Sequence, residues 1–175
     1  MILFVSIIFF ALTFSAPATT EAAATVTIGS QSASNGQNIN VPVTATNFTN
    51  NVGGIDFTIQ YDPALLSYTS ITQNEISGHG TLTVGTTSNT IIVNWFDNSA
   101  LSIDSGTILT LNFAVISSSN TTTNLSFSGG SLSDGNGDPI SPTSFVDGVI
   151  TLNPVNTPTV TTQAGSAADK VKVDP

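Results

Sequence analysis

The segment GIDFTIQY, from Gly54 to Tyr61, alternates strictly between apolar and polar residues. In an extended chain, successive side chains point to opposite faces, so one face would carry Ile55, Phe57, Ile59 and Tyr61, and the other Asp56, Thr58 and Gln60. Asp62-Pro63 ends the pattern, because proline has no N–H for a strand ladder and restricts the residue before it. The segment therefore predicts a strand with one face in a core and the other in water.

Similar short segments recur along the chain and predict an all-β protein. Apolar alternation or short apolar runs bounded by turn residues predict further strands at 25–30, 39–48, 69–76, 81–85, 90–99, 107–116, 124–130 and 144–152. With residues 54–61 this makes about nine short strands, at the spacing typical of a β-sandwich. The residues predicted to face inward include Val26, Ile28, Ile39, Val41, Val43, Ala45, Leu109, Leu111, Phe113 and Val115. Helical periodicity is limited to one turn after Asp62-Pro63.

The two ends of the chain differ in composition from the predicted domain at 25–153. An apolar run at 2–14, followed by the small residues of Ala16-Pro17-Ala18 and Ala22-Ala23-Ala24, predicts a secretory signal peptide over residues 1–24. No positive residue precedes the run, so either the start lies upstream or the segment stays as a weak anchor. The Pro/Thr-rich residues 154–175 predict an extended linker or tail. The expected location is therefore secreted or cell surface.

The distribution of charge restricts the choice of partner. The formal net charge is −9, and the two basic residues, Lys170 and Lys172, both lie in the predicted tail. Because phosphate backbones are bound through cationic side chains, a chain with no Lys or Arg in its domain is not expected to bind nucleic acid. The domain also has no Lys or Arg for an ion pair, so apolar burial and hydrogen bonds have to hold it together.

The residues that could support catalysis or metal binding have simpler explanations. His79, the only histidine, lies between two glycines and is interpreted as a surface residue of a loop. The sequence DGNGD, from Asp134 to Asp138, has the spacing of the first half of a calcium loop. Pro139 and Phe145 stand where that loop needs its glycine and its glutamate, and a turn explains the same residues. We therefore expect no enzyme, no catalytic residues, no bound metal and no cofactor.

An aromatic platform for sugar binding would need exposed Trp or Tyr side chains in a row. Trp95 is the only tryptophan, and its alternation with Ile91 and Val93 places it in the core. The same alternation places Ile92, Asn94 and Phe96 on the outward face.

Several of these segments together resemble a cohesin domain, the bacterial and archaeal module that binds dockerins in cellulosome-type assemblies. The resemblance covers residues 26–152. The segments that carry it are NGQNINVPVTATNF, VGGIDFTIQYDPALL, TIIVNWFDNS, GTILTLNFAV and the closing FSGG…DPISPTSFVDGVITL, in this order and spacing.

The resemblance implies a nine-stranded jelly-roll β-sandwich that docks a dockerin on one sheet face. By similarity, Asp56 matches the aspartate of the family's binding strand, and Asp97 stands where an acidic residue follows the apolar strand. The implied protein-binding residues are Asp56, Thr58, Asn94, Phe96 and Asp97. Gly54 and Asn94 depart from the family, since some members carry asparagine at the first position and leucine at the second. Any calcium is expected on the dockerin.

The implied function is that of a non-catalytic extracellular module that docks a dockerin-bearing partner, as in the assembly of polysaccharide-degrading complexes. One alternative is a carbohydrate-binding or cell-surface adhesion module of the same sandwich class, with polysaccharide as its partner. A structural spacer without a specialised face is a third interpretation.

Overall fold

The computed structural model of the protein describes residues 22–141 and 143–154. The predicted signal peptide and the predicted C-terminal linker fall outside these ranges, except for residues 22–24 and 154. No helix within the described ranges has the length and apolar character that a membrane span requires.

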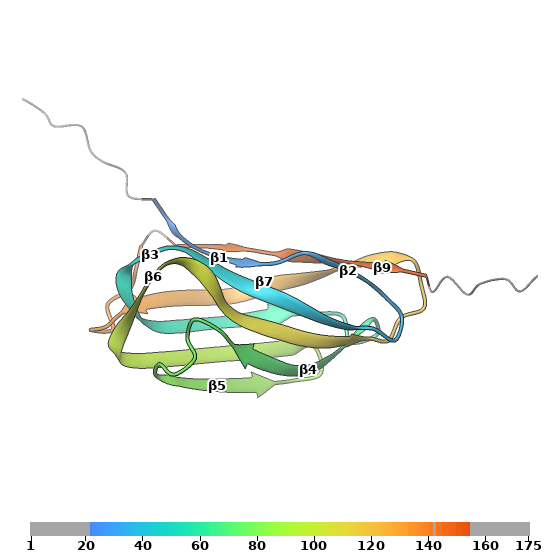
Figure 1. The fold of residues 1–175 in the computed structure, drawn as a ribbon, viewed down its shortest axis with the longest axis horizontal. Coiled ribbons are helices and arrows are strands. Elements are labelled where there is room, and N and C mark those ends of the chain that lie inside the picture. The colour runs from blue at the N-terminus through green and yellow to red at the C-terminus, as the bar shows by residue number, and fades with distance from the viewer. Residues whose placement is uncertain (1–21, 142, 155–175) are drawn as a thin grey trace, which may run out of the picture.

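The described residues form nine strands and no helix (Figure 1). In chain order the strands are β1 (Ala24–Ile28), β2 (Gln31–Ser34), β3 (Asn38–Gln60), β4 (Leu66–Gln73), β5 (Thr81–Thr86), β6 (Thr90–Val115), β7 (Thr121–Asp134), β8 (Thr143–Val146) and β9 (Gly148–Asn153). This confirms the all-β prediction, although the strands divide the chain differently. The structure joins four expected short strands into β3 and β6, splits the last expected strand into β8 and β9, and adds β2 where a turn was expected.

The long strands β3 and β6 form an antiparallel ribbon that folds over on itself. Their pairing runs from Asn38 opposite Ala114 to Gln60 opposite Thr90, with register shifts near the middle. Both strands bend at the same end of the molecule and continue in the other layer, as Figure 1 shows at its left side. Folding a two-stranded ribbon in this way gives the jelly-roll form of β-sandwich.

The bend of the ribbon uses backbone conformations that strands avoid. The three non-glycine residues with positive φ among the described residues, Asn47, Asn51 and Ala100, all lie at this corner. Asparagine tolerates the left-handed region better than most residues, because its short polar side chain forms local hydrogen bonds. The Asn47 side chain also donates a hydrogen bond to the Ala23 carbonyl at 3.2 Å, which ties the corner to the start of β1.

The remaining strands extend the ribbon into two layers. One layer, which we call the front layer although it lies farther from the viewer in Figure 1, has the second half of β3 and the first half of β6 between β7 and β5. In the same layer, β9 and β2 continue the sheet beyond the N-terminal part of β7. In the back layer, the other halves of β3 and β6 lie between β1 and β4, and β8 pairs with β1.

The core fills the space between the layers with the apolar side of each strand. The front layer contributes Ile55, Phe57, Ile59, Ile91, Val93 and Trp95, all 3% exposed or less. The back layer contributes the ten inward-facing residues predicted at 25–30, 39–48 and 107–116, and each of these is buried. Tyr61, at the end of the predicted strand 54–61, was also expected to face inward and is only partly buried. The alternation thus predicted most of the core correctly because each strand has one face in the core and the other in water.

Aromatic rings close one side of the sandwich, between β7 and β8. Phe127 makes edge-on contacts with the buried Phe57 on one side and with Phe145 of β8 on the other, at centroid distances of 5.4 and 5.1 Å. The Phe145 ring covers Gly130, where a Cβ atom would lie 2.5 Å from the ring. The Phe145 ring therefore fills the space that a side chain at position 130 would need.

We expect the substitution Gly130→Ala to lower the free energy of unfolding by about 1–3 kcal/mol, because the added methyl group displaces the Phe145 ring. Gly129→Ala is the matched control, since a Cβ atom at Gly129 meets nothing within 4 Å. The control should change the stability by less than about 1 kcal/mol. Urea denaturation of both variants measures the difference, and equal stabilities would show that Phe145 does not fill this position.

Candidate protein-binding face

The outward side of the front layer is a flat surface built from four neighbouring strands. The registers of β7, β3, β6 and β5 align their outward residues in three rows across the sheet. The rows are Ser133–Gly54–Phe96–Thr81, Ser131–Asp56–Asn94–Thr83 and Gly129–Thr58–Ile92–Gly85. We call these twelve residues the front face.

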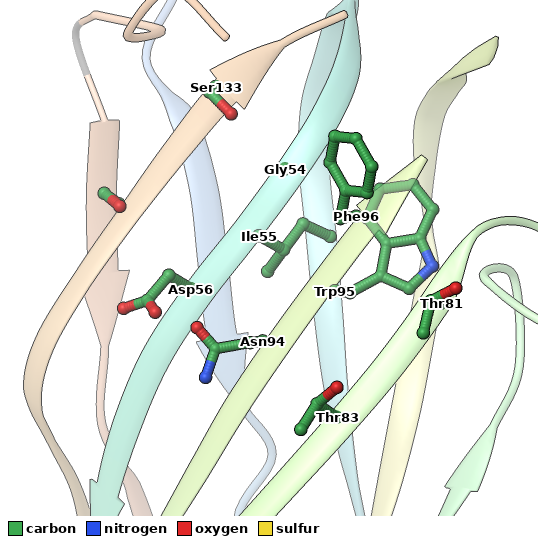
Figure 2. A pocket seen from close by; sticks show the side chains of 10 residues that line it. Gly54, Ile55, Asp56, Thr81, Thr83, Asn94, Trp95, Phe96 and Ser133 are labelled. Atoms are coloured by element: carbon green, nitrogen blue, oxygen red, sulfur yellow. The ribbon is translucent and has the colours of Figure 1, made fainter. Parts of the chain in front are cut away.

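Asp56 carries the only charge on the front face. It lies directly opposite Asn94 on β6 and Ser131 on β7, and Figure 2 shows the Asp56 and Asn94 side chains next to each other. Asp56 is exposed, and no side-chain hydrogen bond joins its carboxylate to another described residue. Its carboxylate oxygens are therefore available to a donor from outside the domain.

A shallow hollow of about 390 Å³ lies at the first two rows of the front face (Figure 2). Gly54 lies in this hollow between Phe96 and Ser133, and the Ser133 hydroxyl occupies the place that a Cβ atom at position 54 would take. The Phe96 side chain also lines the hollow and is 58% exposed, more than any other large apolar residue in the described ranges. The face thus combines a small apolar spot with short neutral side chains and one carboxylate.

Four of the five predicted site residues lie together on the front face, and the fifth does not. Asp56, Thr58, Asn94 and Phe96 belong to adjacent strands and point outward. Asp97 follows the inward phase of Trp95, is only 8% exposed, and accepts a hydrogen bond from the Ser99 backbone N–H at 2.8 Å. The prediction that Asp97 shares one face with the other four residues is therefore corrected. Asp97 directly follows Phe96, and successive side chains of a strand lie on opposite sides of the sheet.

The histidine loop packs against the end of β6. His79 is exposed, as predicted, and its Nδ1 lies 3.8 Å from Asp97 Oδ2. Its backbone carbonyl accepts a hydrogen bond of 2.9 Å from Trp95 Nε1, which satisfies the one polar atom of a buried indole. The loop therefore has a structural role beside the front face.

Several aspartates accept hydrogen bonds from backbone N–H groups of the domain. Asp62 accepts from Ala64, Asp147 from Phe127, and Asp134 from both Asn136 and Asp138, at distances of 2.8–2.9 Å. The backbone donors at Asn136 and Asp138 lower the pKa of Asp134 below its usual value. The DGNGD segment is thus an Asp-centred turn, and no group of three or more potential metal ligands occurs within the described ranges.

Aromatic side chains do not form a platform on the front face. Trp95 is 2% exposed, and Tyr61 and Tyr68 pack edge-on against Phe113 at 5.5 and 5.9 Å. Burial raises the pKa of Tyr68, with a smaller contribution from the neighbouring Tyr61. Phe96 is therefore the one aromatic ring that the front face presents.

The sequence interpretation missed the residues that border the site on its outer strands. Ser131 and Ser133 come from β7, and Thr81 and Thr83 from β5. Alternation around Leu132 could have suggested that the two serines point outward. Alternation does not show that β7 and β5 flank β3 and β6, because strand order depends on contacts between distant parts of the chain.

An all-β jelly roll with a flat, nearly uncharged sheet face is the class of protein that these observations define. The family model described as "Cohesin domain" matches residues 24–152, and the chain belongs to that family. Comparison with curated protein sequences gives no match.

Solved structures share this fold at low sequence identity. A cohesin in a cohesin–dockerin complex from Clostridium thermocellum is 19% identical, with a TM-score of 0.69 over 75% of this chain and 100% of that chain. A non-cellulosomal cohesin from the archaeon Archaeoglobus fulgidus is 23% identical, with a TM-score of 0.68 over 75% and 92%. The solution structure of CaCohA2 from Clostridium acetobutylicum is 22% identical, with a TM-score of 0.67 over 75% of this chain and 91% of that chain. The jelly-roll prediction is thus confirmed.

We expect Asp97→Ala to lower the free energy of unfolding by about 1–2 kcal/mol, because the Ser99 N–H loses its acceptor. Asp56→Ala, which removes an exposed carboxylate from the same layer, should change it by less than about 0.5 kcal/mol. Chemical denaturation at neutral pH measures both. If the two variants were equally stable, Asp97 would have no special role in the fold.

Proposed function

We propose that this protein is a non-catalytic extracellular module that docks a dockerin-bearing partner through its front face, as in the assembly of polysaccharide-degrading complexes. The observation that carries the proposal is the exposed Asp56 carboxylate, which lies at the centre of a flat surface of short neutral side chains. Family membership supplies the class of partner, and the domain geometry supplies the surface.

The composition of the front face suits protein docking. Serine, threonine and glycine have few rotamers to lose when a partner covers them, so association costs little side-chain entropy. A carboxylate without an internal partner forms charge-assisted hydrogen bonds with hydroxyl, Lys or Arg donors of another protein. The calcium of such a complex belongs to the dockerin, as expected from the resemblance.

The proposed non-catalytic role is supported by how the carboxylates are used. Asp62, Asp97, Asp134 and Asp147 each accept backbone hydrogen bonds that hold turns or strand ends in place. A catalytic pair would need two carboxylates facing one substrate. Asp62 and Asp147 lie in two separate loops, Asp97 lies within β6, and Asp134 is the last residue of β7. The extracellular setting rests on the apolar run at 2–14 and the small residues after it.

We expect Asp56→Ala to weaken the binding of a calcium-loaded dockerin by about tenfold or more, because a donor of the partner would lose its acceptor. The measurement is a titration of immobilised chain with a panel of dockerins, followed by comparison of the variants against each dockerin that binds. Asp104→Ala is the matched control, since it removes an exposed carboxylate from the back-layer part of β6.

The control should bind each dockerin as the wild type does. If no dockerin of the panel binds, the proposed partner class is wrong. If a dockerin binds and Asp56→Ala does not affect it, the partner class holds and the front face is not the docking surface.

A further inference from the structure

Three segments of the chain have the form Asn-x-Ser or Asn-x-Thr, in which x is not proline, and they begin at Asn47, Asn120 and Asn124. This tripeptide is the acceptor sequence for N-linked glycosylation of secreted and surface proteins. In a chain rich in Asn, Ser and Thr, the tripeptide also arises by chance. The structure distinguishes the three sites, because a transferase must reach both the Asn amide nitrogen and the hydroxyl group two positions later.

Asn47 is not available as an acceptor in the folded domain. Its side-chain nitrogen, the atom that would bond to the sugar, donates a hydrogen bond of 3.2 Å to the Ala23 carbonyl. The residue is only partly exposed and has a φ of 59° at the corner of the β3–β6 ribbon. A transferase would reach this nitrogen only after the corner had opened.

Asn124 is exposed but lies within a strand ladder, where it pairs with Val149 of β9. The hydroxyl residue of this tripeptide, Ser126, is partly buried and pairs with Gln60 of β3. A transferase that enclosed this tripeptide would have to separate β7 from both of its neighbours. Asn124 is therefore a poorer acceptor than a residue at the end of a strand.

Asn120 is the most accessible of the three sites. It is exposed, lies in the loop between β6 and β7, and directly precedes Thr121, the first residue of β7. The hydroxyl residue Thr122 is also exposed, and within residues 22–141 and 143–154 neither the Asn120 amide nor the Thr122 hydroxyl makes a hydrogen bond. Strand ends open at a lower free-energy cost than strand centres, so this tripeptide can leave the ladder without unfolding of the domain.

Asn120 lies far from the front face. The loop between β6 and β7 and the bend of the ribbon lie at opposite ends of the molecule (Figure 1), and the first row of the front face lies next to the bend. The extended chain from Asn120 to Ser131, the β7 neighbour of Asp56, is roughly 35 Å long. A glycan attached at Asn120 is therefore compatible with docking on the front face.

We propose that Asn120 is the N-glycosylation site of this protein, with a lipid-linked oligosaccharide as the donor. The Asn120 amide nitrogen forms a bond to the anomeric carbon of the sugar, and the bond from that carbon to the lipid phosphate oxygen breaks. The phosphate leaves with the bonding electron pair, and the proton that the amide nitrogen loses goes to a base of the transferase. This inference rests on the proposed extracellular setting, because N-linked glycans mark secreted and surface proteins.

The test is mass spectrometry of the full-length protein purified from the cells that naturally produce it, before and after treatment with an amidase that removes N-linked glycans. A chymotryptic digest is used, because residues 22–154 contain no Lys or Arg for trypsin to cut after. The peptide with Asn120 should carry a glycan, and the amidase should convert this Asn to Asp. Asn47 is the matched control within the same digest and should be unmodified.

Two results of this measurement would overturn the inference. An exported protein without a glycan at Asn120 would overturn it and leave the proposed docking function standing. A protein found only inside the cell, without a glycan, would overturn the extracellular setting as well.

Variants produced in the same cells separate recognition of the tripeptide from an effect on the fold. Asn120→Gln and Thr122→Ala should each abolish glycosylation at residue 120, whereas Thr122→Ser, which keeps the hydroxyl group, should retain it. All three replace exposed side chains, so after amidase treatment their thermal unfolding should match that of the wild type. A glycan that persists at Asn120 in Thr122→Ala, or one found on Asn124 in place of Asn120, would contradict the proposal.

Discussion

The antiparallel pairing of β3 with β6 is the interaction on which the rest of the structure depends. One ribbon supplies central strands to both layers, and its bend near Asn51 and Ala100 turns the apolar side of each half toward the other. The other strands pair with the edges of the ribbon or with one another and contribute further side chains to the core between its two halves. Because the pairing joins Asn38 to Ala114, it closes a long stretch of chain and makes folding depend on distant contacts.

The same ribbon also determines what the front face contains. A strand whose inward residues are Ile55, Phe57 and Ile59 must point Gly54, Asp56 and Thr58 outward, and β6 follows the same rule around Trp95. The register between the strands then brings Asp56 opposite Asn94, and Gly54 opposite Phe96. The charged and the apolar part of the face are thus placed one row apart by strand geometry, without help from flexible loops.

Periodicity alone predicted most of the buried residues, because the direction of a side chain along a half-buried strand depends on local alternation. The exception is Tyr61, which follows β3 and is only partly buried. Periodicity also placed Trp95 in the core and Asp56, Asn94 and Phe96 outside. The same alternation excludes Asp97 from the front face, and only the family resemblance suggested including it. The hollow at Gly54 could not be predicted, because it depends on β7 lying beside β3 and bringing Ser133 next to the glycine. Strand order and bends result from tertiary contacts that local sequence does not encode.

Because residues 22–154 contain no Lys or Arg, the interactions that stabilise the fold differ from those that attract another molecule. Inside the described domain, the one close pair of opposite charge requires a protonated His79 next to Asp97, so stability depends mainly on the apolar core and backbone hydrogen bonds. Salt screens charges on exposed surfaces and affects apolar burial much less. Electrostatic attraction between the acidic domain and any molecule of opposite charge therefore varies with ionic strength while the fold stays intact. The front face fits this pattern, because the Asp56 carboxylate has no hydrogen-bond partner inside the described domain. It is therefore available for docking.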